Sequence, residues 1–125
     1  MVRITKVHTG GGDTGKTSLL DGKRVGKENL RVGVYGTIDG LNSQIGVVRM
    51  ELNRHNHSDF VDDVDDKLGI IQQELFDIGG ECSCSPGKLP PQMALIGMEQ
   101  CDRLVTEMDE MLEDLSPLTS FIMPT

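Results

Sequence analysis

Three long segments of the sequence carry apolar residues at every third or fourth position. This spacing places the apolar side chains on one face of an α-helix, so the pattern predicts three amphipathic helices. The first stripe comprises Ile38, Leu41, Ile45, Val48 and Leu52. The second comprises Phe60, Val64, Leu68, Ile71, Leu75 and Ile78. The third comprises Leu95, Met98, Cys101, Leu104, Met108, Met111 and Leu112. We therefore expect an all-α fold, an antiparallel helical bundle.

Capping residues and helix breakers set the expected boundaries of these helices. Thr37 has the side chain of an N-cap, so the first helix is expected to begin there, with Asp39 in its first turn. The second helix is expected from Ser58 to Gly79 and Gly80, and the third over residues 92–115. Three apolar stripes are covered best in a bundle of four or five helices or by oligomerisation. We expect that this chain contains three of about five long helices.

Composition excludes several classes of protein. With one Tyr, three Phe and no Trp, the core must be built from Leu, Ile, Val and Met, which suits helices better than a β-sandwich. The net charge is −8, and the basic residues are concentrated near the start of the chain. This distribution indicates a local anion site and no nucleic-acid surface. We expect no membrane partner, because no apolar run reaches transmembrane length.

The three cysteines and the start of the chain bear on its location. An odd number of cysteines argues against a disulfide framework. Residues 1–8 show no apolar segment typical of a signal peptide. A cytoplasmic location with reduced thiols is therefore expected.

The glycine-rich segment Gly10–Thr17 matches the pattern G-x-x-x-x-G-K-[ST] of nucleotide triphosphatase phosphate loops. In such loops backbone N–H groups surround phosphate, the lysine neutralises it and the hydroxyl holds Mg²⁺. A phosphate loop opens directly into a helix. Here only Ser18–Leu20 precede the turn expected at Asp21–Gly22, and no buried strand follows. We favour phosphate binding by these glycines in another fold, with a phosphate-loop nucleotidase as the alternative.

Four ordered blocks of sequence resemble the propanediol-utilisation-type ATP:cob(I)alamin adenosyltransferases. The segment Thr9–Leu19 is similar to their N-terminal signature, roughly T-K-T-G-D-x-G-x-T-S-L. The segment Arg31–Ser43 resembles R-V-E-A-Y-G-T-x-D-E-L-N-S. The segments Ile71–Phe76 and Phe121–Pro124 resemble the second-helix signature and F-I-L-P. The resemblance spans the whole chain.

The resemblance implies a reaction and its participants. In the family, the cobalt of a reduced corrinoid attacks the 5′ carbon of ATP, and triphosphate leaves. It therefore implies that the protein makes adenosylcobalamin from ATP and cobalamin, with Mg²⁺. It further implies a homotrimer with active sites between subunits and a corrinoid reductase as a possible partner.

The resemblance also implies roles for individual residues. It assigns ATP binding to Thr9, Gly10, Gly11, Gly12, Thr17, Ser18 and Lys27. The glycines would supply backbone donors, the hydroxyls further contacts and Lys27 positive charge. Asp39 would pair with an arginine of a neighbouring subunit, and Phe121 would close the lower face of the corrin ring. We predict no metal site, because Cys82 and Cys84 have no second cysteine pair.

The chain is expected to form part of one domain, and it departs from the family pattern at some positions. We expect residues 1–125 to form one partial domain, with a glycine-rich ATP-binding loop over 1–33 and part of a helical bundle over 34–125. Gly10 stands where the family has Lys or Arg. Family members continue with helices that carry an Arg-Arg-x-x-Arg cluster, so this chain alone is expected to turn over near background. A non-catalytic helical fragment is the further alternative.

Overall fold

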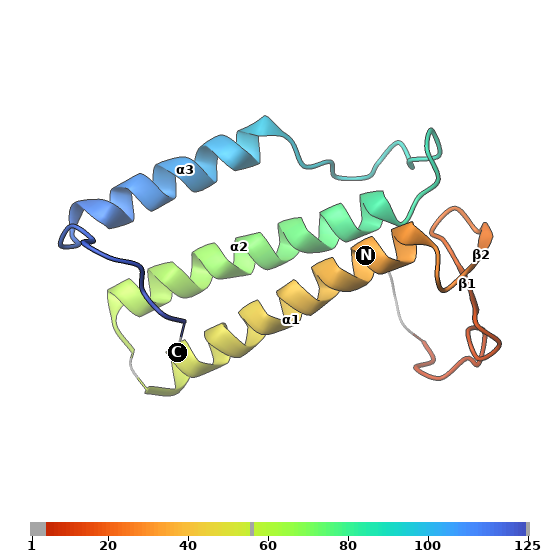
Figure 1. Cartoon of the computed structure of the whole chain (residues 1–125), viewed down its shortest axis with the longest axis horizontal. Coiled ribbons are helices and arrows are strands. Elements are labelled where there is room, and N and C mark those ends of the chain that lie inside the picture. The colour runs from red at the N-terminus through yellow and green to blue at the C-terminus, as the bar shows by residue number, and fades with distance from the viewer. Residues whose placement is uncertain (1–4, 56, 125) are drawn as a thin grey trace. The chain divides into compact units, whose positions relative to one another are not determined.

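The computed structural model describes residues 5–55 and 57–124. A short hairpin of strands β1 (Lys16–Ser18) and β2 (Arg24–Gly26) precedes three helices. The helices are α1 (Leu30–His55), α2 (Asp59–Cys82) and α3 (Met98–Glu113) (Figure 1). The fold is mostly helical, which confirms the predicted class. Two compact units divide the chain, the first ending at Leu95 and the second beginning at Ile96.

Helix α1 begins at Leu30, so the predicted start at Thr37 is wrong. The side chain of Asn29 accepts a hydrogen bond from the amide of Arg31 at 3.0 Å and performs the capping role. The hydroxyl of Thr37 instead donates to the carbonyl of Gly33 at 3.0 Å, inside the helix. Asp39 therefore lies in the interior of α1 and not in its first turn. Gly33 and Gly36 lie within α1, because packing against α2 outweighs their low helix propensity.

Helix α2 begins as predicted and ends later than predicted. Ser58 is its N-cap, and its hydroxyl accepts a hydrogen bond from the amide of Val61 at 3.2 Å. The helix continues through Gly79 and Gly80 to Cys82, so the predicted end at the glycine pair is wrong. Neither glycine has a positive φ, so neither forms the left-handed cap that ends many helices.

Helices α1 and α2 lie side by side as an antiparallel pair (Figure 1), and polar side chains join them. The side-chain amide of Asn42 donates to the carbonyl of Gln72, and that of Gln72 donates to the carbonyl of Asn42, both at 3.0 Å. Further along, Arg49 and Asp65 form a bidentate ion pair with N–O distances of 2.7 and 2.8 Å. These contacts fix the register of the two helices.

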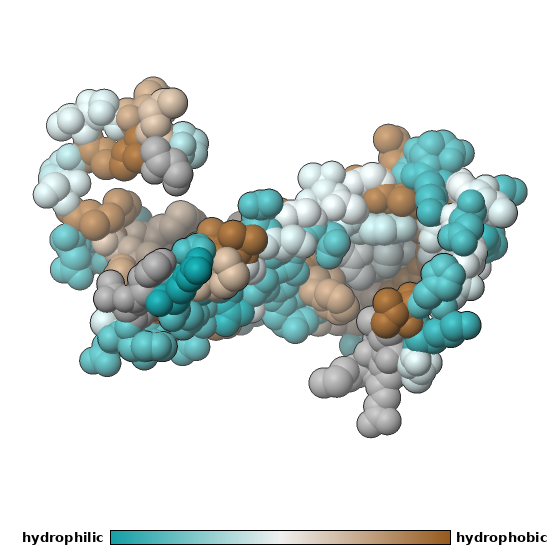
Figure 2. Space-filling view, turned by 90° about the horizontal axis from the view of Figure 1, so that it is seen from below, coloured by the Kyte–Doolittle hydropathy of each residue, from teal (hydrophilic) through white to brown (hydrophobic). Residues whose placement is uncertain are grey.

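The predicted apolar stripes are only partly buried. In α1, Leu41 and Val48 face outward with 53% and 49% of their surface exposed, whereas Ile45 is half-buried. In α2, Phe60 is 69% exposed and the neighbouring Val61 is buried. The side of α1 that contacts α2 contains the half-buried Asn42 and Arg49, so the apolar spacing alone misplaced the contact face by part of a turn. Figure 2 shows apolar residues at the surface among hydrophilic ones.

The hairpin is attached to the end of the helix pair where α1 begins and α2 ends (Figure 1). The predicted turn at Asp21–Gly22 is confirmed by the positive φ of Gly22, +84°, although the strands beside it were not predicted. The amide of Leu20 donates to the carbonyl of Ser83 at 2.9 Å, and the amide of Ser85 donates to Asp21 at 3.1 Å. The hairpin thus has a defined place on the helices.

The second unit contains α3, which is shorter than the predicted segment 92–115. Its N-cap is Gly97, whose amide donates to the side chain of Gln100 at 2.8 Å. No side chain of α3 is buried, and Met98 and Met108 are 72% and 54% exposed. Among the described residues, no helix is long and apolar enough to cross a membrane.

Candidate functional site

The glycine-rich loop makes two consecutive turns between Gly10 and Gly15. The amide of Asp13 donates to the carbonyl of Gly10 at 3.2 Å, and that of Gly15 to the carbonyl of Gly12 at 3.4 Å. Gly10 and Gly15 have φ angles of +69° and +79°, a region that favours glycine. The loop can therefore take this shape only with glycine, or at some strain, at these two positions.

Several amides of this loop have no protein acceptor among the described residues. Within residues 5–55 and 57–124, the backbone N–H groups of Gly11, Gly12 and Thr14 donate to no protein atom. Each is an obligatory donor that needs either water or a ligand. Successive free N–H groups in a turn are a common way to bind an anion. The loop can thus offer donors to phosphate oxygens without a helix N-terminus.

The side chain of Lys27 lies against this loop. A Cβ atom at Gly12 would stand 3.2 Å from both Cε and Nζ of Lys27, so its ammonium is next to the free amide of Gly12. The backbone amide of Lys27 also donates to the carbonyl of Gly15 at 2.9 Å, which ties the end of β2 to the loop. The predicted cation and the predicted glycines are therefore brought together.

Arg24 is a site residue that the sequence analysis missed. Its Nη2 donates to the carbonyl of Gly11 at 2.9 Å and to that of Lys16 at 3.4 Å. Its Nη1 donates to the hydroxyl of Ser18 at 3.2 Å. Arg24 and Ser18 are direct partners in the hairpin. A prediction of both strands in register would have placed Arg24 beside the loop.

The remaining predicted ATP-binding residues lie in or beside the loop. The hydroxyl of Thr9 stands 3.8 Å from where a Cβ at Gly11 would be. Thr17 is half-buried in β1, and Ser18 is exposed beside it with its hydroxyl already accepting from Arg24. The seven predicted ATP-binding residues therefore lie in or next to the loop, in β1 and, for Lys27, directly after β2.

Asp39 and Phe121 belong to other elements of the chain than this group. Asp39 is exposed on α1, and within the described part of the chain its carboxylate forms no hydrogen bond or ion pair. No such contact joins it to the glycine-rich loop within that part. Phe121 belongs to the second unit, after α3, and is fully exposed.

An open groove of about 620 Å³ adjoins the loop at Lys27. Its lining comprises Lys27, Glu28, Asn29, Leu30, Gly33, Val34, Thr37 and Ile38. Leu30 and Val34 give it exposed apolar surface, 86% and 47% respectively. A ligand with one anionic end and one flat apolar end would fit this combination of surfaces.

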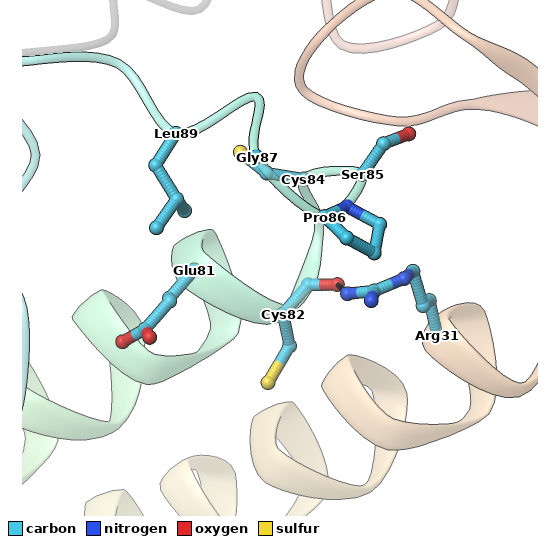
Figure 3. A pocket seen from close by; sticks show the side chains of 8 residues that line it. All are labelled: Arg31, Glu81, Cys82, Cys84, Ser85, Pro86, Gly87 and Leu89. Carbon is cyan, nitrogen blue, oxygen red and sulfur yellow. Dashed lines mark hydrogen bonds between the residues drawn. The ribbon is translucent and has the colours of Figure 1, made fainter.

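A second cavity, of about 230 Å³, lies at the end of α2 (Figure 3). Arg31 donates to the carbonyl of Cys82 at 3.2 Å on one side of it. The thiols of Cys82 and Cys84 point away from each other (Figure 3). Burial raises the pKa of the Cys84 thiol. No group of three or more His, Cys, Asp or Glu side chains that could hold a metal occurs among the described residues.

The path of the chain after the loop excludes a nucleotide triphosphatase phosphate loop. Thr17 continues into β1, and the chain then turns back through β2. No helix opens directly from the loop, as phosphate-loop proteins require. The phosphate-loop alternative is therefore wrong for this fold.

Comparison with known proteins identifies the family. The family model described as cobalamin adenosyltransferase matches residues 7–125. This chain belongs to the cobalamin adenosyltransferase family. A cobalamin adenosyltransferase of Cupriavidus metallidurans is 38% identical to this family member over 98% of the chain and 60% of the relative. A corrinoid adenosyltransferase of Bacillus subtilis is 37% identical over 95% of the chain and 58% of the relative.

A solved structure shares the fold of this cobalamin adenosyltransferase family member. It is a variant of a PduO-type ATP:corrinoid adenosyltransferase from Lactobacillus reuteri, complexed with cobalamin and ATP. The TM-score is 0.80 at 23% identity, and the match covers 96% of this chain and 64% of that one. This chain spans about 60% of the length of the Cupriavidus relative.

Proposed function

We propose that this chain supplies the ATP-binding part of a corrinoid adenosyltransferase. The reaction transfers the 5′-deoxyadenosyl group of ATP to the cobalt of reduced cobalamin and releases triphosphate. The observation that carries the proposal is the loop itself, in which the ammonium of Lys27 lies beside Gly12 and, within the described residues, the amides of Gly11, Gly12 and Thr14 donate to no protein atom. Donors and a cation converge where a triphosphate would need them.

The chemistry needs positioning and charge stabilisation from the protein. The cobalt of reduced cobalamin is the nucleophile, so a cobalt–carbon bond forms as the bond between the 5′ carbon and the phosphate oxygen breaks. The electron pair of that bond leaves with the triphosphate. Backbone donors and Lys27 would stabilise the charge of this leaving group. Thr9, Thr17 and Ser18 would add hydroxyl contacts, and Mg²⁺ would be held mainly by the phosphate oxygens.

The adjoining groove suggests where the adenosine end would lie. The groove runs from Lys27 to Ile38 along the start of α1, and Leu30 and Val34 supply apolar surface. A nucleotide whose triphosphate contacts Lys27 could extend its base over these side chains. The loop and the groove are thus matched to the two ends of one ligand.

Asp39 and Phe121 have roles in this proposal that depend on other parts of the assembly. The exposed carboxylate of Asp39 would bind an arginine of a neighbouring subunit. Phe121, fully exposed here, would cover the lower face of the corrin ring. We propose a homotrimer, since outward-facing apolar residues of α1 such as Leu41 and Val48 need a partner surface.

The remaining assignments follow from the same proposal. Residues 1–125 would form one partial domain, with residues 1–33 as the ATP-binding loop region and 34–125 as the helical part. The first turn of α1 lies within residues 1–33, because the helix begins at Leu30. A cytoplasmic location fits the three free cysteines. A corrinoid reductase would supply the reduced cobalt.

A chimera tests the function directly. Residues 1–124 of this chain would be followed by the C-terminal segment of the Bacillus subtilis relative, with that full-length relative as the positive control. We expect the chimera to convert ATP and chemically reduced cobalamin to adenosylcobalamin, followed by absorbance. The same chimera with Lys27→Ala should lose most of this activity. A folded chimera that binds cobalamin but forms no adenosylcobalamin would contradict the proposal.

A further inference from the structure

We propose that Arg24 is a positioning residue that holds the glycine-rich loop in its anion-binding shape. The inference rests on the proposed role of that loop in binding ATP. Arg24 lies in β2, outside the loop, and its guanidinium reaches back across the hairpin to it. It makes three hydrogen bonds there, to Gly11, Lys16 and Ser18.

The contacts of Arg24 join the two ends of the loop. Gly11 lies near the start of the loop, and Lys16 follows its last turn as the first residue of β1. Nη2 of Arg24 donates to both carbonyls, at 2.9 and 3.4 Å. A guanidinium has a rigid planar arrangement of donors, so it fixes the positions of its acceptors relative to one another. The side chain of Arg24 therefore connects the two ends of the loop.

The contact with Gly11 also sets the direction of a free amide. The carbonyl of Gly11 and the N–H of Gly12 belong to one peptide plane and, in a trans peptide, point to opposite sides. When Arg24 holds this carbonyl, the N–H of Gly12 is directed away from Arg24. The ammonium of Lys27 lies beside Gly12. Arg24 thus orients a donor of the site while its own guanidinium is on the other side of the peptide.

The loop needs such a restraint because of its composition. Gly10, Gly11, Gly12 and Gly15 have more backbone freedom than other residues, and ordering each costs conformational entropy. Only two turn hydrogen bonds lie within the loop. With Arg24 in place, the glycine-rich loop becomes ordered when the chain folds. Without it, ordering would accompany ATP binding and reduce the affinity.

The test compares Arg24→Ala and Arg24→Lys with the unaltered chain. Calorimetry measures ATP affinity, and NMR measures amide exchange of Asp13 and Gly15 without ligand. We expect Arg24→Ala to weaken ATP binding about tenfold, because one more residue must be ordered on binding. Exchange at Asp13 and Gly15 should become faster. Arg24→Lys should resemble Arg24→Ala, because lysine keeps the charge but lacks the planar set of donors.

Arg54→Ala is the matched control. It removes the same charge from an exposed side chain whose ion pair is with Glu51 on the same helix. Arg54→Ala should leave both the ATP affinity and the amide exchange of Asp13 and Gly15 unchanged. The slope of ATP affinity with salt concentration should also be the same in Arg24→Ala and the unaltered chain, since no phosphate contact is lost.

Three results would overturn the inference. Unchanged ATP affinity in Arg24→Ala, or unchanged amide exchange in the loop, would show that Arg24 does not order it. Full recovery in Arg24→Lys with a reduced salt slope in Arg24→Ala would identify Arg24 as a direct phosphate ligand. If the unaltered chain binds no ATP, the proposed function itself fails, and the role of Arg24 in it fails for that separate reason.

Discussion

The carboxylate of Asp21 accepts a hydrogen bond from the amide of Ser85 at 3.1 Å, across 64 positions of sequence. The same carboxylate accepts from the amide of Lys23 at 3.1 Å, within the hairpin turn. Asp21 therefore links the turn to the segment that follows α2. Since the glycine-rich loop leads directly into this hairpin, the link fixes the place of the candidate ATP site on the helices.

Acid should weaken this link. Ser85 and the amide of Lys23, both beside the carboxylate, lower the pKa of Asp21. A carboxyl whose pKa is lower in the folded state stabilises that state above the ordinary pKa of about 4, and this contribution is lost as the pH falls further. We expect exchange at the Ser85 amide to accelerate below about pH 4, measured by NMR and corrected for intrinsic rates. In Asp21→Asn this pH dependence should be smaller. Equal dependence in both proteins would contradict the assignment.

The ion pair between α1 and α2 should matter more than an exposed one. The hydrogen bond from Arg49 lowers the pKa of Asp65, whose side chain is only 18% exposed. Asp65→Asn should reduce the melting temperature near neutral pH, and the difference from the unaltered chain should shrink as the pH falls below about 4. Glu51→Gln, which removes an exposed pair with Arg54, should have little effect. An unchanged melting temperature in Asp65→Asn would show that the pair between Arg49 and Asp65 does not stabilise the fold.

Two neighbouring leucines provide a test of how the hairpin is held. Leu19 is 5% exposed and Leu20 is 52% exposed. Leu19→Ala should lower the free energy of unfolding by about 2 kcal/mol or more, because it leaves a cavity in a small core. Leu20→Ala should cost less than about 1 kcal/mol. Urea unfolding followed by circular dichroism measures both. Similar losses in the two variants would contradict the burial of Leu19.

Gly10 and Gly11, both in the first turn of the loop, should differ in their tolerance of a side chain. Gly10 has a φ of +69°, whereas Gly11 has no positive φ and a Cβ there would meet only the Thr9 hydroxyl, at 3.8 Å. Gly10→Ala should destabilise the loop by about 1 kcal/mol, which is about fivefold faster exchange at the Asp13 amide. Gly11→Ala should change this rate much less. The same strain applies to a Lys or Arg at position 10, the types that the family pattern carries there.

Sequence periodicity predicted the helical class and the start of α2, because both depend on local features. Ser58 and the acidic residues after it mark a helix start in any context. The start of α1 was misplaced because Thr37 has the side chain of a cap, although its hydroxyl bonds back to Gly33. Asn29 provides the cap instead, and a threonine inside a helix can form this bond to the carbonyl four residues earlier.

The candidate site was predicted as a list of residues but not as an arrangement. The glycines and Lys27 came from resemblance to the family, and the structure brings them together. Arg24 was missed because its role depends on the hairpin, whose strands are three residues each and too short for alternation to reveal. The free amides of Gly11 and Gly12 could not be foreseen, since they depend on which backbone groups pair in the folded loop.

The affinity of the chain for ATP, with and without Lys27, tests the central claim most directly. Isothermal titration calorimetry would compare the unaltered chain, Lys27→Ala and Lys88→Ala, in which an exposed lysine far along the sequence from the loop is removed. Charge-assisted contacts contribute about 1.5–3 kcal/mol, so we predict that Lys27→Ala weakens ATP binding about tenfold or more while Lys88→Ala has no effect. Equal ATP affinity in all three proteins, or no binding by the unaltered chain, would contradict the assignment of the glycine-rich loop as the ATP site.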